Sequence, residues 1–179
     1  SSIPEFFNIN KSIKVLKFFL ETIFSKIKVP EFKSKIYIRR EDANYRKILN
    51  EADLIEKLRK NDFDIINPQH FEILTQMKIF SNAELILTAH GSNLSNIVFC
   101  NKGTKIIEIS PDFNSQYEED LSVRYKNISN LMELNFEKII ADTVEVDSHS
   151  ILAKKYINSN ILDNSNYYKN LILKISDID

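Results

Sequence analysis

The chain has 179 residues, which is enough for one domain with a substantial core but too few for two domains of ordinary size. Its 24 basic and 25 acidic residues give a formal net charge of -1, which argues against a broad surface for nucleic acid or anionic lipid. The single cysteine, Cys100, excludes a disulfide framework and suits a reducing compartment, so we expect a cytoplasmic protein.

The first predicted element is an amphipathic helix near the N-terminus. Apolar residues recur at steps of three and four from Ile13 to Ile27, lysines fall on the opposite side, and Pro30 ends the pattern. Charged residues interrupt the stretch well before the ~20 apolar residues that a membrane span needs. We therefore expect a connector over residues 1–32, which either packs on the following domain or docks on a neighbouring domain or surface.

The remaining residues, 33–179, alternate short apolar runs with helical patterns. Strands are expected at 35–39, 62–66, 85–88, 105–109 and 138–146, helices at 51–60, 70–82, 94–100 and 116–129, and peripheral helices and turns over 151–175. Strands that alternate with helices in this way form a parallel sheet with helices on its faces. The sequence predicts an α/β fold, a doubly wound, mostly parallel Rossmann-like sheet flanked by helices.

Glycine is rare in this chain, which has only Gly91 and Gly103, whereas an ordinary usage of about 7% would give about a dozen. Gly103 marks a turn before an expected strand. Gly91 stands between an expected strand and an expected helix. We expect Gly91 to adopt a positive φ or to let a ligand approach the backbone.

The first expected strand ends in Arg39 and Arg40, and Arg46 follows in the same loop. Such residues lie at the carboxyl edge of a parallel sheet, where ligands usually bind. Guanidinium groups suit phosphate, because their planar fork makes paired charge-assisted hydrogen bonds. The alternative is a solvated surface in which Glu41 and Asp42 balance the arginine charge.

A second group of polar residues, His90 to Asn93, comes directly before an expected helix. Free backbone N–H groups from Gly91 to Leu94 would face a ligand in the crevice and favour an anion. Alternatively, Ser92 or Asn93 caps the helix and His90 satisfies a loop carbonyl. His90 is also the nearby candidate for acid–base chemistry.

Other side chains were weighed for the same edge of the sheet. Glu108 leaves the fourth expected strand and either accepts hydrogen bonds from sugar hydroxyls or is solvated. The segment 62–64 resembles a metal–diphosphate D-x-D motif, but it begins a strand and belongs at the amino edge. The chain has neither a G-x-G-x-x-G nor a G-x-S-x-G motif, and its histidines and Cys100 lack metal-ligand spacing. We expect neither a metal nor a cofactor.

Several of these segments together resemble the catalytic-domain motifs of glycosyltransferase family 61. They are YIRR at 37–40, Arg46, LNEADL at 49–54, HGSNLSN at 90–96 and IIEI at 106–109, in order and with compatible spacing. The LNEADL segment also predicts that Asn50 caps a helix, with Asp53 near the capping-box position. The resemblance implies the carboxyl-terminal, donor-binding half of a two-domain GT-B enzyme. It further implies an inverting transferase with a UDP-linked sugar donor and a glycan acceptor, in a family whose bacterial members are linked to capsular or surface polysaccharide.

The resemblance also assigns roles to residues. It implies that Arg39 and Arg46 hold the diphosphate, that Asn50 and Glu51 shape the same pocket, that His90, Gly91, Ser92 and Asn93 line the donor cleft, and that Glu108 lies near the sugar or ribose. Arg40, beside Arg39, is a further predicted substrate-binding residue. Asn93 departs from the family, where glycine or alanine is common, and it either narrows the turn or adds a hydrogen bond. We expect the catalytic base in the acceptor half.

Two alternatives to the transferase remain open. The chain could be a catalytically inactive nucleotide-binding module or partner subunit, derived from a truncated paralogue. It could also be a phosphate-sugar enzyme that uses the same crevice for other chemistry.

Overall fold

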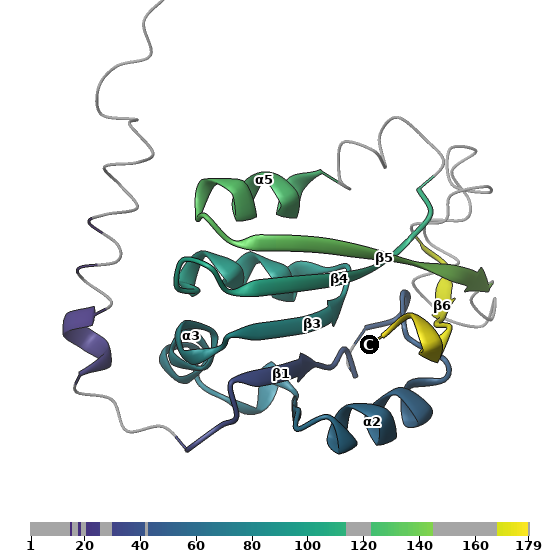
Figure 1. Cartoon of the computed structure of the whole chain (residues 1–179), viewed down its shortest axis with the longest axis horizontal. Coiled ribbons are helices and arrows are strands. Elements are labelled where there is room, and N and C mark those ends of the chain that lie inside the picture. Colours follow the sequence, from purple (N-terminus) through teal and green to yellow (C-terminus); the bar gives the residue numbers. More distant parts are fainter. Residues whose placement is uncertain are drawn as a thin grey trace, which may run out of the picture.

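The computed structural model describes residues 15, 18, 21–25, 30–41, 43–113, 123–144 and 168–178. Within these residues, six strands form one sheet in the order β2-β1-β3-β4-β5-β6 (Figure 1). The strands are β1 (Lys35–Ile38), β2 (Asp64–Ile66), β3 (Leu85–Ala89), β4 (Lys105–Pro111), β5 (Asn135–Val144) and β6 (Asn170–Ile172). All neighbouring strands pair in parallel except β5 and β6, which pair antiparallel. The predicted mostly parallel sheet is confirmed.

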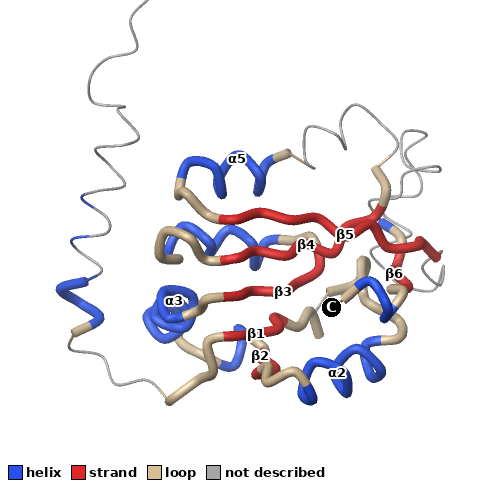
Figure 2. The backbone as a smooth tube through the Cα atoms, in the orientation of Figure 1, coloured by secondary structure: helices blue, strands red, loops and turns tan. Residues whose placement is uncertain are grey.

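Helices cover both faces of this sheet. The described α-helices are α2 (Glu51–Lys60), α3 (Ile73–Asn82) and α5 (Arg124–Leu131), and the 3-10 helices are η2 (Pro68–His70), η3 (Ser92–Phe99) and η5 (Ile175–Asp177). Phe80 of α3, Ile97 of η3 and Tyr125 of α5 share one apolar core. Leu54 of α2 and Leu171 of β6 belong to a second core. Figure 2 shows α2 beside the C-terminal segment and apart from α3 and α5.

The direction of the chain explains this arrangement. From β1 the chain moves to β2 on one side, and it then returns across β1 to build β3, β4 and β5 on the other side. Right-handed crossovers in opposite directions place their helices on opposite faces of a sheet. This puts α2 opposite α3, η3 and α5, so the predicted doubly wound architecture is confirmed.

Most predicted boundaries are close to those observed, and α2 has the predicted bounds. The second strand begins at Asp64 instead of Asp62, because Asp62 has a φ of 67° and completes the turn after α2. The third helix begins at Ile73, because Pro68–His70 forms a separate 3-10 turn. Much of the start predicted for the helix at 116–129 lies outside the described residues.

Two predicted elements differ in type. In the described part of 151–175, residues Asn170–Ile172 form a strand where helices and turns were expected. Leu171 and Leu173 are buried while Ile172 is 39% exposed, which is the two-residue period of a strand. The helix expected at 94–100 is a 3-10 helix throughout, Ser92–Phe99. A 3-10 helix has three residues per turn, so the buried residues Leu94, Ile97 and Cys100 lie on one face.

The predicted N-terminal helix lies largely outside the described residues. Residues 21–24 are helical, and Lys78 Nζ of α3 donates a hydrogen bond to the Phe24 carbonyl at 2.6 Å. This contact joins the described part of the helix to the domain. In the part of the chain that the structure describes, no helix has the length and apolar character needed to cross a membrane.

Candidate functional site

A pocket of about 330 Å³ lies at the carboxyl ends of β1 and β3. These strands are neighbours where the strand order reverses, which is the usual place for ligands in doubly wound sheets. Its lining consists of Tyr37, Arg39, Arg40, Glu41, Arg46, Lys47, Ile48, Glu51 and Ala89. Four of these side chains are cationic and two are carboxylates, so the pocket has a positive balance that suits an anion.

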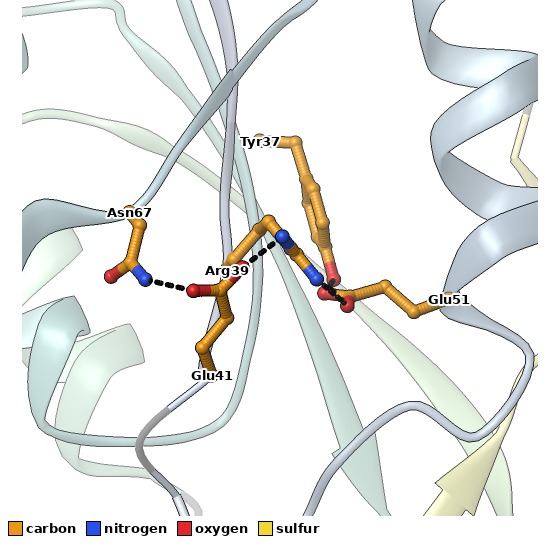
Figure 3. A network of polar contacts seen from close by, with 5 residues as sticks. All are labelled: Tyr37, Arg39, Glu41, Glu51 and Asn67. Atoms are coloured by element: carbon orange, nitrogen blue, oxygen red, sulfur yellow. Dashed lines mark hydrogen bonds and ion pairs between the residues drawn. The ribbon is translucent and has the colours of Figure 1, made fainter.

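Arg39 lies at the centre of a polar network at the tip of β1 (Figure 3). Its Nη2 and Nε atoms donate to Glu51 Oε2 at 2.7 and 3.2 Å, and the Tyr37 hydroxyl donates to Glu51 Oε1 at 2.9 Å. On the other side, Glu41 pairs with Arg39 and accepts a hydrogen bond from Asn67 Nδ2 at 2.7 Å. The hydrogen bond that Arg39 donates to Glu51 raises the pKa of Arg39 above its ordinary value. The guanidinium is therefore held in one orientation.

The three predicted phosphate-binding arginines, Arg39, Arg40 and Arg46, all line this one pocket. Charge balance by Glu41, which was the alternative prediction, is also present, while Asp42 lies outside the described residues. The arginine cluster and its carboxylates therefore coexist in the pocket.

Arg46 has an unusual backbone conformation. It is 3% exposed and has a φ of 55°, whereas Asp62 and Glu133, the other described non-glycine residues with positive φ, lie in exposed turns. The Arg46 guanidinium stacks over the Tyr45 ring, 4.7 Å from its centre. Such a conformation costs about 1–3 kcal/mol and persists only where the surroundings impose it.

Gly91 follows the tip of β3 and lies beside the Arg40 side chain, which lines the pocket. The prediction of a left-handed φ at Gly91 is wrong, because its φ of 166° and ψ of -179° are both close to 180° and the backbone is extended. Instead, the Arg40 guanidinium occupies the space that a side chain would take, since its Nη1 atom would lie 1.2 Å from an added Cβ and would have to move. Asn93 Nδ2 donates to the Arg39 carbonyl at 3.4 Å, so Asn93 adds a hydrogen bond between the tips of β1 and β3.

The start of η3 is only partly as predicted. Leu94 N–H donates to the Gly91 carbonyl at 3.0 Å and is not directed at a ligand. This follows from the 3-10 pattern, in which bonding begins one residue earlier than in an α-helix. No side chain caps η3, so the alternative role of Ser92 or Asn93 as a cap is wrong. Ser92 is exposed and Asn93 is half-buried.

His90 and Glu108 form a buried pair between the tips of β3 and β4. Nδ1 of His90 contacts Oε1 of Glu108, and the two residues are 4% and 0% exposed. Rings of Phe113 and Tyr125 meet the imidazole edge-on, with centres 5.1 and 5.3 Å away. Burial lowers the pKa of His90, although the Glu108 contact opposes the shift. The alternative of a solvated Glu108 is wrong.

Asn50 holds the N-cap position of α2, but its side chain makes no capping hydrogen bond. Asn50 Nδ2 instead donates to the Leu173 carbonyl at 2.7 Å, and the Leu173 N–H donates to Asn50 Oδ1 at 3.1 Å. The capping prediction is therefore wrong, because both amide atoms bind the C-terminal segment. That segment has no recognisable motif in the sequence, and its partnership with Asn50 was not predicted.

The D-x-D segment lies away from the pocket, as predicted. Asp62 pairs with Lys33 Nζ at 2.8 Å, and Asp64 Oδ2 accepts from the Lys33 N–H at 2.8 Å, at the amino end of β2.

Sequence reasoning missed Tyr37 as a member of the polar network. The alternation of Tyr37 with Arg39 along β1 could have placed both on one face.

A family model described as glycosyltransferase 61 matches residues 4–107, a range that contains every residue lining the pocket. The chain belongs to this glycosyltransferase family. The EGF domain-specific O-linked N-acetylglucosamine transferase of Drosophila melanogaster is 26% identical over 117 residues, which are 62% of this chain and 22% of that protein. The chain thus spans about a fifth of the length of this curated relative. The resemblance drawn from the motifs is confirmed, and the chain belongs to a family of enzymes that transfer sugars.

Proposed function

We propose that this glycosyltransferase domain binds a nucleoside-diphosphate sugar, with the diphosphate in the pocket lined by Arg39, Arg40 and Arg46. The observation that carries the proposal is that these three arginines line a single pocket at the strand-order reversal. A diphosphate has several oxygens that accept charge-assisted hydrogen bonds, and each such bond contributes about 1.5–3 kcal/mol. We also propose that Ser92 and Asn93 lie at the margin of the donor cleft.

The proposed reaction is a single displacement with inversion. An acceptor hydroxyl forms a bond to the anomeric carbon while the bond from that carbon to the diphosphate breaks. A base takes the hydroxyl proton, and the arginines stabilise the charge that develops on the leaving diphosphate. His90 is enclosed by Glu108 and aromatic rings, so we assign it to holding the turn after β3 and place the base outside the described residues.

The donor is proposed to be UDP-linked. The named relative is an N-acetylglucosamine transferase, so N-acetylglucosamine is the sugar to test first. The acceptor is proposed to be a glycan, such as a growing capsular or surface polysaccharide.

Isothermal titration calorimetry with UDP tests the pocket directly. Arg39→Ala is expected to weaken UDP binding about 10- to 150-fold, because it removes one charged hydrogen bond. Arg59→Ala is the matched control, since Arg59 is exposed on α2 and does not line the pocket. Equal UDP affinities for the two variants, or no binding by the unmodified chain, would contradict the proposal.

A catalytically inactive nucleotide-binding module is the second candidate. It is favoured by the placement of His90, the predicted acid–base candidate, which forms a buried pair with Glu108 and is not among the residues lining the pocket. The two candidates differ in turnover, so the measurement is UDP release from UDP-N-acetylglucosamine with and without acceptor glycans. UDP binding without acceptor-dependent UDP release by this chain would support the module.

A further inference from the structure

The segment 168–173, here called the C-terminal clamp, lies against the loop that carries Arg46 (Figure 1). The N–H of Arg46 donates to the Lys169 carbonyl at 2.9 Å, and the N–H of Lys47 donates to Asn170 Oδ1 at 3.0 Å. The two contacts join residues that are more than 120 positions apart in the chain. They fix the backbone of two residues that line the pocket.

The same pairing continues beyond Arg46. The N–H of Leu171 donates to the Lys47 carbonyl and the N–H of Leu49 donates to the Leu171 carbonyl, both at 2.8 Å. Leu171 is 0% exposed and belongs to the core beneath α2, so the clamp is itself firmly anchored. Asn50 extends the contact through its two hydrogen bonds with Leu173.

Aromatic packing completes the clamp at its other end. The rings of Tyr45 and Tyr168 meet edge-on, with centres 5.1 Å apart, and the Arg46 guanidinium lies over the Tyr45 ring. The clamp therefore contacts the residues on both sides of Arg46. The left-handed conformation of Arg46 occurs at the point where these contacts converge.

We propose that the C-terminal clamp is a positioning element of the donor pocket, which holds Arg46 in its left-handed conformation so that its guanidinium faces the diphosphate. This inference rests on the proposed function. The clamp lies beyond residue 107, where the match to the family model ends, so the family match does not account for it. Asn50 and Asn170 act through Arg46 and are positioning residues.

The test uses the full chain with the double substitution Asn50→Ala and Asn170→Ala, here called the clamp variant, which removes the two side-chain amides that join the C-terminal clamp to residues 47–50. The matched control is Asn101→Ala, whose Nδ2 donates to the Ser81 carbonyl at 2.8 Å and which does not line the pocket. Two measurements are made on each protein, the UDP affinity by calorimetry and the hydrogen exchange of backbone amides by mass spectrometry. Circular dichroism checks that both variants remain folded.

In the clamp variant, we expect amides in residues 45–50 to exchange faster while those of β3 remain protected, because only the loop loses support. We expect UDP affinity to fall about tenfold, and to change less than twofold in the control. Unchanged exchange in residues 45–50 would overturn the clamp. Faster exchange with unchanged UDP affinity would overturn its positioning role.

These experiments distinguish a failure of the proposed function from a failure of the clamp. If the unmodified chain binds neither UDP nor pyrophosphate, the donor assignment of the pocket is refuted, and the role of the clamp at a diphosphate is refuted with it. The exchange measurement needs no ligand, so it still decides whether the clamp holds the Arg46 loop.

Discussion

Replacing Gly91 by alanine is expected to weaken UDP binding while leaving the domain folded. The backbone at Gly91 is extended, with a φ of 166°, so alanine fits this conformation. The new Cβ would lie 1.2 Å from Nη1 and 2.5 Å from Cζ of Arg40, which forces the guanidinium to move. Because these atoms are the far end of a flexible side chain, we expect the free energy of unfolding to change by less than about 1 kcal/mol.

The effect on the pocket should be larger than the effect on stability. Arg40 lines the pocket, and moving its guanidinium would remove one charged hydrogen bond to the proposed diphosphate. A bond of this kind contributes about 1.5–3 kcal/mol, which corresponds to about 10- to 150-fold in affinity. Calorimetry with UDP measures the affinity, and urea denaturation of the same protein measures the free energy of unfolding.

A double-mutant cycle identifies the cause. If Gly91→Ala acts by displacing Arg40, it should have no further effect in the Arg40→Ala background, so the two changes should be strongly non-additive. If Gly91→Ala weakens UDP binding equally in both backgrounds, the reasoning is refuted. That result would indicate that the ligand itself approaches the Gly91 backbone.

Three further outcomes are expected from the buried groups. Tyr37→Phe should lower the free energy of unfolding by about 0.5–1.5 kcal/mol in urea denaturation, because the Tyr37 hydroxyl donates to Glu51. Tyr125→Phe is the control, since Tyr125 is equally buried and no hydrogen bond joins its hydroxyl to another described residue; an equal loss in both variants would contradict the argument. Burial lowers the pKa of His90 below 6.5, so the unfolded chain binds the proton more readily and stability should fall as pH decreases below that value. Urea denaturation between about pH 8 and pH 5 should show a shallower loss for His90→Gln than for the unmodified chain, and parallel curves would refute this. Burial raises the pKa of Cys100 to about 12, so a thiol reagent near neutral pH should modify it only after unfolding, and rapid modification of the native chain would contradict its placement.

The sheet was predictable from the sequence because its signals are local. β1, β3 and β4 are short apolar runs, and the intervening patterns have the length of crossover helices. The position of the pocket followed from the same signals, since the carboxyl ends of parallel strands share an edge. The grouping of Arg39, Arg40 and Arg46 at that edge needed no knowledge of side-chain contacts.

The parts that sequence reasoning missed depend on long-range contacts. The constraint at Gly91 comes from Arg40, which reaches across from the neighbouring strand. The Arg46 N–H donates to the Lys169 carbonyl, and the Asn50 side chain donates to the Leu173 carbonyl, more than 120 positions away in the chain. No period or turn signal encodes such partners, and β6 has only three residues in which to show its alternation.

The parallel pairing of β4 with β5 has a practical consequence for recombinant expression. β5 covers one edge of β4 along seven residue pairs, from Lys105 to Pro111. A polypeptide shortened to the matched family region would lose β5 and part of β4, leaving apolar strand backbone open to pairing with other molecules. Such a product is expected to aggregate, so expression boundaries should extend through Ile178, a buried residue of the core that contains Leu54.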